Sequence, residues 1–264
     1  MKISYLAPKG TYCYEACIQY NKDKNYETVP CKTITETILE VIEQKTEYAI
    51  VPLENSIEGS VVETIDALLK YEQLWIQEQI ILDINHCLLT QEGCTQIKEI
   101  YSHPQALAQC RNYILQNFPN CEIHQALSTA NAAEIAKQKS NTACIANKAC
   151  SDVYGLKILA ENIQDVTHNQ TRFIVIGTEK KQNPNKVSLV FSTLDEPGAL
   201  YRVLGLFNIF EINLTKIESR PARTELGKYN FWVDFEGNIE DDHITVLLEQ
   251  VKKRCTYFRI LGTY

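Results

Sequence analysis

The sequence predicts an α/β protein built from two domains. Three observations lead to this prediction: short apolar segments alternate with segments of helical periodicity, a polar stretch without an apolar period spans residues 180–186, and the elements beyond it follow a different order. Strands that alternate with helices indicate a sheet covered by helices, and a break in composition of this kind is typical of a domain boundary. We therefore expect a first domain at residues 1–180 and a second at residues 187–264.

The first domain is expected to open with a strand at residues 3–6. Apolar residues at helical spacing predict a helix over residues 34–42, and the apolar run after it predicts a buried strand that Pro52 ends. Another helix should start after the Glu58-Gly59 turn. The same patterns predict strands at residues 80–90, 142–146 and 171–177 and helices at residues 104–115 and 128–137.

The second domain is expected to have the order strand, helix, strand, strand, helix, strand. The strands are predicted at residues 187–192, 212–219, 229–235 and 256–261, and the helices at residues 199–209 and 242–254. This order is that of the ferredoxin-like βαββαβ plan.

Composition and charge exclude several classes of protein. The formal net charge is -7, so we expect neither a nucleic-acid partner nor an anionic membrane surface, both of which favour clustered Lys and Arg. The N-terminus lacks the apolar core of an export signal, and no later run approaches a membrane span. The ten cysteines are scattered without a disulfide framework. We expect a cytoplasmic protein with reduced thiols.

Searches for cofactor and metal motifs find no match. The sequence has no glycine-rich dinucleotide fingerprint, no phosphate-loop lysine motif, no His-Glu-x-x-His and no Cys-x-x-Cys. Cys13 and Cys17 lie one helical turn apart, but no neighbouring His or further Cys completes a ligand set, so we interpret them as core thiols. Four histidines lack ligand spacing: His86, His124, His168 and His243. We expect no metal ion and no cofactor.

Five dense polar clusters stand at the expected ends of elements, where backbone N–H groups and short side chains can converge on a ligand. In chain order they are residues 8–11, 52–59, 102–110, 128–130 and 169–173. Each alone could serve only in capping and turns, and for Ser128-Thr129 that interpretation weighs as much as a binding role.

Taken in order, these clusters closely resemble the motifs of the prephenate dehydratase family, and the resemblance covers almost the whole chain. Residues 7–11 (Ala-Pro-Lys-Gly-Thr) look like the family's Gly-Pro-x-Gly-Thr start, and residues 52–56 and 102–105 match its Pro-x-Glu-Asn-Ser and Ser-His-Pro-Gln boxes. The Thr-Arg-Phe signature is intact at residues 171–173. The departures are Ala7 for the usual Gly, and Tyr12-Cys13 where Phe-Ser or Phe-Thr is common.

The resemblance implies a two-lobed catalytic domain like a type II periplasmic binding protein, with the site in the cleft between the lobes. One lobe would hold about residues 1–78 and 158–180, and the other about residues 79–157. The second domain, residues 187–264, resembles an ACT regulatory domain, because residues 197–200 and 218–221 look like its two phenylalanine-binding motifs. The implied effector residues are Gly198, Ala199, Leu200, Asn213, Glu218, Ser219, Arg220 and Pro221.

The family's threonine in the Thr-Arg-Phe signature is regarded as essential, which makes Thr171 the candidate donor to a departing hydroxyl. Because a threonine hydroxyl is a very weak acid, we expect it to polarise that group or relay a proton. The expected catalytic residues are Thr171, Ser102, Asn55 and Gln109. The expected substrate-binding residues are Thr11, Ser56, Glu54, His103, Arg172, Phe173 and Thr129.

Two of these roles stay open at the level of the sequence. Arg172 could clamp a substrate carboxylate, or it could form a structural ion pair, because strand residues alternate faces and Arg172 follows Thr171. His103 could act as a charged donor or orient the Ser102 loop.

The implied activity is the conversion of prephenate to phenylpyruvate, CO2 and water in L-phenylalanine biosynthesis, with feedback by L-phenylalanine through the ACT domain. Aromatisation drives this elimination, so no cofactor is required. Two alternatives remain: an arogenate dehydratase and, in a different class, a non-catalytic amino-acid sensor. We expect a dimer or a tetramer. Since Lys9 already lies inside the first cluster, we expect no fused chorismate mutase segment ahead of it.

Overall fold

The computed structural model describes residues 1–181, 185–222 and 227–264, which divide into two compact units. The first unit contains Met1–Lys70 and Ile80–Val175, and the second contains Tyr71–Gln79 and Ile176–Tyr264. The domain limits proposed from the sequence, residues 1–180 and 187–264, remain a prediction. One short internal segment, Tyr71–Gln79, belongs to the same unit as the C-terminal part of the chain, which the sequence did not predict.

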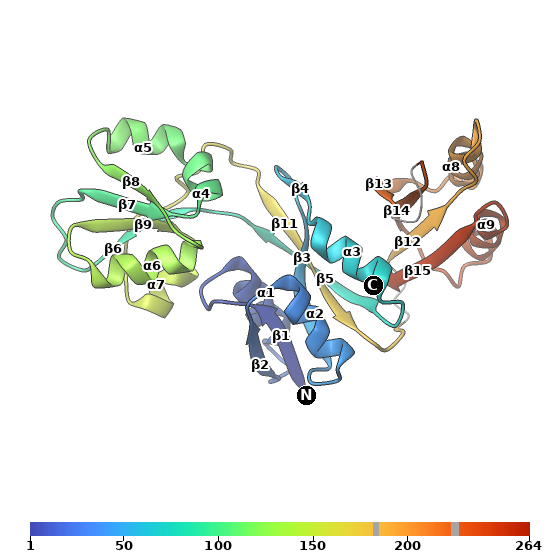
Figure 1. Ribbon diagram of the computed structural model, residues 1–264, viewed down its shortest axis with the longest axis horizontal. Coiled ribbons are helices and arrows are strands. Elements are labelled where there is room, and N and C mark those ends of the chain that lie inside the picture. Colours follow the sequence, from blue (N-terminus) through green and yellow to red (C-terminus); the bar gives the residue numbers. More distant parts are fainter. Residues whose placement is uncertain (182–184, 223–226) are drawn as a thin grey trace. The chain divides into compact units, whose positions relative to one another are not determined.

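The first unit contains a mixed sheet with the strand order β5-β11-β3-β1-β2 (Figure 1). β1 pairs with both β2 and β3 in parallel, and the two-residue β4 pairs antiparallel with the end of β3. The bounds are β1 Lys2–Leu6, β2 Glu27–Cys31, β3 Tyr48–Asn55, β4 Gly59–Ser60, β5 Trp75–Asp83 and β11 Gln170–Gly177.

Three helices cover this sheet: α1 (Tyr12–Asn21), α2 (Ile34–Ile42) and α3 (Val62–Lys70). Thr11 and Thr33 begin the first two, because each side chain accepts a hydrogen bond from an otherwise unpaired N–H in the first turn. The apolar face of α1 packs on a core that includes Tyr5, Ile50 and Phe173, so the start of β11 is anchored in the core.

A second sheet in the same unit has the order β10-β6-β9-β7-β8. Its strands are β6 Cys87–Thr90, β7 Glu99–Ser102, β8 Glu122–Gln125, β9 Thr142–Ala146 and β10 Lys157–Ala160. Helices cover both faces of this sheet (Figure 1), and those on each face pack on an apolar core of their own. The helices are α4 Pro104–Gln109 and α5 Arg111–Asn117 on one face, and α6 Thr129–Gln138 and α7 Ala149–Tyr154 on the other.

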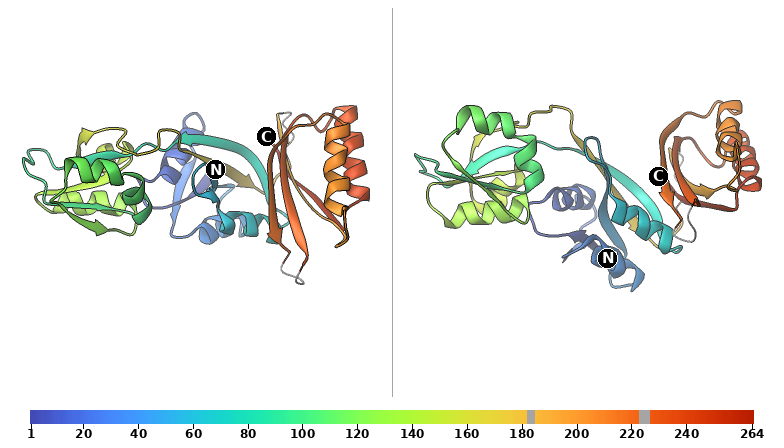
Figure 2. Two further views of the ribbon diagram at one scale, coloured as in Figure 1. Left: turned by 90° about the horizontal axis from the view of Figure 1, so that it is seen from above. Right: turned by 45° about the horizontal axis from the view of Figure 1, so that its top comes forward.

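The second unit confirms the predicted βαββαβ order. Its four strands form an antiparallel sheet in the order β13-β14-β12-β15, and helices α8 and α9 lie side by side on one face of it (Figure 2). At its outer edge β15 meets the segment Tyr71–Gln79 through Gly262 and Ile76. The bounds are β12 Lys186–Ser192, α8 Ala199–Ile209, β13 Leu214–Pro221, β14 Tyr229–Glu236, α9 Asp242–Lys253 and β15 Tyr257–Thr263.

Two predicted elements are wrong, since each is interrupted. The strand expected at residues 80–90 ends at Asp83, because the next N–H groups bond outside a ladder: Ile84 donates to the Asn169 carbonyl (2.7 Å) and His86 to the Gln164 side chain (3.0 Å). The helix expected at residues 104–115 breaks at Cys110, where the preceding carbonyl accepts from the Asp165 N–H (2.7 Å). Both interruptions lie beside the cleft described below.

Within the described ranges, no helix is both long and apolar enough to span a bilayer. All ten cysteines are free thiols.

Candidate active site

A cleft of about 580 Å3 opens in the first unit, a size suited to a small organic ligand. Its walls come from element ends on both sheets: the loop after β3, the start of α1, the segment between β5 and β6, helix α4, the start of α6 and the start of β11. Each of the five polar clusters of the sequence contributes at least one side chain to this lining. The clusters therefore surround one cavity.

Asn55 joins the two chain segments that carry the polar groups of the cleft. Its Nδ2 donates to Thr171 Oγ1 (2.9 Å), to Asn169 Oδ1 (2.7 Å) and to the Gln170 carbonyl (3.1 Å). These three bonds hold the loop after β3 against the first residues of β11. The structure thus brings two of the expected catalytic residues, Asn55 and Thr171, into direct contact.

Ser56 serves the same junction and does not line the cleft. Its N–H donates to the Gln170 carbonyl (2.8 Å), and its hydroxyl oxygen accepts from the Gln170 N–H (2.9 Å). This pair of bonds acts like one rung of a sheet ladder. Ser56 therefore fixes the position of the neighbouring Asn55.

The alternation of β11 decides where its side chains lie. Thr171 and Phe173 line the cleft, whereas Arg172 points to the other face and forms an ion pair with Glu54 (3.0 Å). The Arg172 side chain is only 6% exposed, and neither partner lines the cleft. Of the two roles left open for Arg172, the structure contains the ion pair.

Ser102 is fully buried at the end of β7, and its hydroxyl donates to the Ile145 carbonyl (2.6 Å). It does not line the cleft. Thr11 does line the cleft, but its hydroxyl caps α1: it accepts from the Tyr14 N–H (3.3 Å) and donates to the Pro8 carbonyl (3.0 Å). In this structure both hydroxyls hold backbone in place.

His103 and Thr129 line the cleft at the starts of two helices. His103 caps α4, with Nδ1 accepting from the Gln105 N–H (3.4 Å). Ser128 caps α6 by accepting from the Asn131 N–H (2.9 Å), and Thr129 is the first residue of that helix. The remaining free N–H groups at the start of α6 provide partial positive charge for an anionic group.

Gln109 lies at the centre of contacts that the sequence did not reveal. Its Oε1 is 2.9 Å from His86 Nε2 and accepts from Asn169 Nδ2 at 3.3 Å. His86 is 3% exposed, and burial lowers its pKa, so the imidazole is neutral at neutral pH. The available signals were weak: His86 stands alone beside an apolar run, and Asn169 lies inside the fifth cluster without an assigned role.

Among the described residues, this lining contains one lysine, Lys32, and one carboxylic acid, Glu58. Lys32 directly follows β2, a strand without an apolar period, so no sequence pattern pointed to this residue. Cys13 also lines the cleft, but burial raises the pKa of its thiol to about 12. A protonated thiol is a poor nucleophile, so Cys13 does not point to covalent chemistry.

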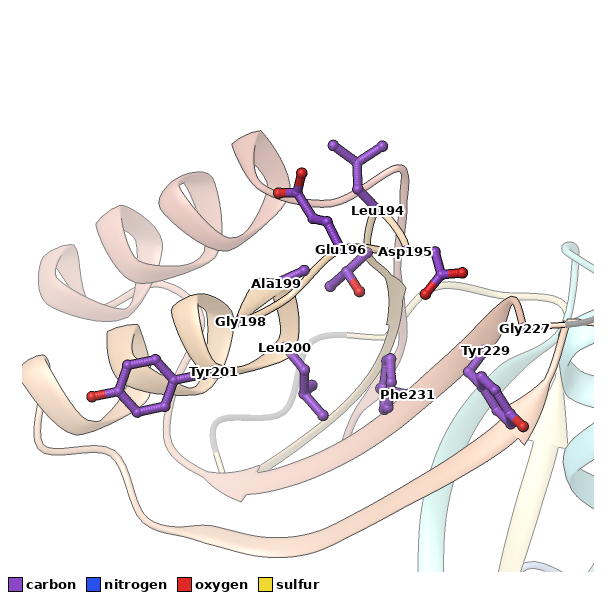
Figure 3. A pocket seen from close by; sticks show the side chains of 11 residues that line it. Leu194, Asp195, Glu196, Gly198, Ala199, Leu200, Tyr201, Gly227, Tyr229 and Phe231 are labelled. Atoms are coloured by element: carbon purple, nitrogen blue, oxygen red, sulfur yellow. The ribbon is translucent and has the colours of Figure 1, made fainter.

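The second unit has a pocket of about 420 Å3 beside the start of α8. It is lined by Gly198, Ala199 and Leu200, together with Tyr229 and Phe231 on β14. Figure 3 shows Leu200 and Phe231 pointing into the space between helix and strand. Gly198 has φ +77°, a left-handed conformation that only glycine adopts without strain, so the chain turns tightly into the helix.

The other expected effector residues do not line this pocket. Asn213 directly precedes β13, and Glu218 forms an ion pair with Lys216 on that strand (3.2 Å). The rest of the set also lies on β13: Ser219, Arg220 and Pro221.

One trio of potential metal ligands occurs in the part of the chain that the structure describes: Glu99, Glu122 and His124, whose ligand atoms lie within 4.8 Å of one another. Lys139 forms an ion pair with Glu99 and places a positive charge at the same carboxylate. That charge competes directly with a cation.

Comparisons with known proteins agree with this geometry. A family model described as prephenate dehydratase matches residues 3–181, and one described as ACT domain matches residues 187–253. The curated prephenate dehydratase of Methanocaldococcus jannaschii is 41% identical over 271 residues, which covers 99% of this chain and 97% of that protein.

Two solved structures are similar over their length. The prephenate dehydratase of Staphylococcus aureus has a TM-score of 0.89 at 32% identity and covers 100% of both chains. The prephenate dehydratase of Arthrobacter aurescens, in complex with L-Phe, has a TM-score of 0.89 at 30% identity and covers 99% of this chain and 89% of that one. The chain belongs to the prephenate dehydratase family, as a lyase whose catalytic region is followed by an ACT regulatory domain.

Proposed function

We propose that the cleft converts prephenate to phenylpyruvate, CO2 and water, and that L-phenylalanine bound to the ACT domain regulates this reaction. The single observation that carries the proposal is the contact between Asn55 and Thr171. Because Thr171 Oγ1 accepts from Asn55 Nδ2, the hydroxyl proton of Thr171 is left for another acceptor. In this proposal a ligand hydroxyl bound in the cleft accepts that proton in a hydrogen bond.

The chemistry follows from the substrate. The bond between the ring and its carboxylate breaks, its electron pair enters the ring, and the bond to the C4 hydroxyl breaks as one proton is taken up to release water. Hydroxide is a poor leaving group, so a donor at the C4 oxygen lowers the barrier. Thr171, polarised by Asn55, is that donor in our proposal, as a hydrogen-bonding or relaying group and not as a strong acid.

The substrate carries two carboxylates, which need positive charge or N–H donors. Lys32 and the start of helix α6 offer these at the cleft, and Gln109 offers an amide. Arg172, which was one candidate for this role, is engaged with Glu54 on the opposite face of β11. We therefore assign the carboxylates to Lys32 and the Ser128-Thr129 turn.

The regulatory proposal rests on the pocket beside α8. Leu200 and Phe231 offer an apolar surface for an aromatic ring, and the tight turn at Gly198 leaves backbone accessible to an amino acid's charged groups. The relative from Arthrobacter aurescens was solved with L-Phe. We also propose a cytoplasmic protein that assembles as a dimer or tetramer, with a second subunit completing the effector pocket.

The decisive experiment is an assay of phenylpyruvate formation from prephenate, with arogenate tested in parallel. We expect turnover of prephenate, a fall of roughly a hundredfold or more in kcat for Thr171→Val, and partial recovery in Thr171→Ser, which keeps the hydroxyl. Turnover of arogenate alone would replace the substrate in this proposal. No turnover of either compound would favour the amino-acid sensor.

Effector binding is tested separately by calorimetry with L-phenylalanine. Leu200→Ala should weaken binding, because it removes apolar surface from the pocket, whereas Ile209→Ala on the same helix should not, because Ile209 is 72% exposed and does not line the pocket. Equal effects of the two variants would contradict the assignment of the pocket.

A further inference from the structure

The orientation of the Gln109 amide is set by a chain of hydrogen bonds that begins at two backbone groups. The N–H groups of Ile57 and Glu58 donate to Asn55 Oδ1 (2.9 and 3.0 Å). A backbone N–H can only donate, so the atom it meets must be the amide oxygen. The Nδ2 of Asn55 therefore faces Thr171 and is a donor there.

The orientation of the Asn55 amide in turn fixes that of the Asn169 amide. Asn55 Nδ2 donates to Asn169 at 2.7 Å, so the atom of Asn169 on that side must be its oxygen. The opposite atom of the same amide is then Nδ2, and it donates to Gln109 at 3.3 Å. The atom of Gln109 that faces Asn169 must be Oε1.

His86 completes the chain. Its Nε2 lies 2.9 Å from the same Gln109 Oε1. Since an amide oxygen cannot donate, Nε2 must carry the hydrogen, and in the neutral imidazole the lone pair is then on Nδ1. One tautomer of His86 follows from two backbone N–H groups that lie far from it in the sequence.

This arrangement determines which way the nitrogen of the Gln109 amide points. Its Oε1 accepts from two side chains, while its Nε2 is buried and has no hydrogen-bond partner among residues 1–181, 185–222 and 227–264. Gln109 is among the residues that line the cleft, and its N–H2 group is the part of the amide that has no partner within the described ranges. If the amide were reversed, Nε2 would meet the donors of Asn169 and His86, and an oxygen would face the ligand.

We propose that His86 and Asn169 are positioning residues, which hold the Gln109 amide with its N–H2 group toward the substrate. The inference rests on the proposed function for its substrate, an anion whose carboxylate or departing hydroxyl accepts from Gln109. His86 touches Gln109 and acts through it. In the sequence, His86 lacks the spacing of a metal ligand, and no other pattern assigns it a role.

The test is a double-mutant cycle on kcat for prephenate with His86→Leu, Gln109→Ala and both together. His86→Leu should lower kcat roughly ten- to a hundredfold, with a smaller change in KM, because the amide is no longer held in the productive orientation. In the Gln109→Ala background the same change should cost less than about twofold. An equal loss in both backgrounds would overturn the proposal, since His86 would then act independently of Gln109.

A conservative variant guards against a trivial loss of folding. His86→Gln places an amide N–H near the position of Nε2 and should restore most of the activity lost in His86→Leu. Thermal unfolding of all variants, followed in parallel, separates altered stability from altered orientation. Failure of His86→Gln to recover activity, in a protein that unfolds at the wild-type temperature, counts against the proposal.

A spectroscopic measurement does not depend on turnover. Long-range 1H–15N correlation spectra distinguish the protonated from the unprotonated ring nitrogen of a histidine, and we expect His86 to carry hydrogen on Nε2 alone at neutral pH. If wild type does not turn over prephenate, the proposed function fails, and this spectrum still decides the orientation of Gln109. Hydrogen on Nδ1 alone would overturn the inference.

Discussion

The amide nitrogen of Asn55 lies 2.9 Å from the hydroxyl oxygen of Thr171, although 116 residues separate them in the chain. The contact has a direction, because the oxygen of the same amide is already held by two backbone N–H groups. Asn55 must therefore be the donor in this bond, and the hydroxyl of Thr171 donates its own hydrogen to a different acceptor.

Replacing Asn55 with Asp should reverse this direction. The carboxylate still accepts from the backbone N–H groups of the loop, but it no longer donates to Thr171, whose proton then turns toward Asp and away from the substrate. We expect kcat to fall at least a hundredfold. The midpoint of thermal unfolding should also fall, because the Asn169 side-chain oxygen and the Gln170 carbonyl lose their donor. A variant that keeps wild-type kcat would show that the direction of this bond is unimportant.

Arg172 should matter for stability and little for substrate affinity. Removing one partner of a buried ion pair leaves an uncompensated charge, and because Glu54 is 28% exposed we expect Arg172→Met to cost roughly 2–3 kcal/mol, near or below the low end for buried pairs. Denaturant unfolding and KM for prephenate measure the two effects.

The surface pair Lys157–Glu92 gives a matched control for that measurement. Its side chains are 51% and 81% exposed, so Lys157→Met should leave stability unchanged within error. A large rise in KM for Arg172→Met at wild-type stability would indicate instead that Arg172 binds the substrate.

Gly262 should tolerate no side chain. A Cβ at this position would lie 2.8 Å from Ile76 Cβ and closer still to the Ile76 carbonyl oxygen, so Gly262→Ala forces the two strands apart. We expect a loss of about 1–3 kcal/mol. Gly205→Ala within α8, where a Cβ meets nothing within 4 Å, should instead raise stability by up to about 1 kcal/mol.

Stability should also respond to pH through His86. Burial lowers the pKa of His86 in the folded protein, so below about pH 6.5 the unfolded chain binds a proton that the folded protein refuses. The free energy of unfolding should therefore fall as the pH drops below about 6.5. This group contributes at most about 1.4 kcal/mol per pH unit. Above about pH 7.5 the contribution is constant.

The variant His86→Gln isolates this contribution. The difference in unfolding midpoint between wild type and His86→Gln should shrink or reverse as the pH is lowered from 7.5 to 5.5. A difference that stays constant across this range would show that His86 does not titrate with unfolding.

The apolar period predicted much of the fold, because most elements bury one regular face. All six elements of the second unit lie within two residues of their predicted bounds. Several strands were missed, and two of them had no such pattern: β8 is largely exposed along its length, and β2 is at the edge of its sheet. The interruptions at Ile84 and Cys110 come from hydrogen bonds to the distant residues Asn169 and Asp165, which no local pattern reports.

In the site, too, local patterns could be predicted from the sequence, whereas contacts between distant residues could not. The polar clusters could be found because short side chains gather at element ends, and the family motifs directed attention to Asn55, Gln109 and Thr171. The role of each hydroxyl could not be found, because it depends on which carbonyl lies nearby: Ser102 reaches Ile145, across 43 positions. The structure alone brings His86 to Gln109.

The pairing of Gly262 with Ile76 has a consequence for dissecting the protein. The two family regions look modular, because they adjoin in sequence without overlap. A chain cut after residue 181 would nevertheless keep the apolar residues Leu74 and Ile76, both fully or almost fully buried, and lose Gly262 and Arg259, which contact this segment. The shortened protein would display a bare strand edge, so it should self-associate, and its kinetics would not describe an unregulated enzyme.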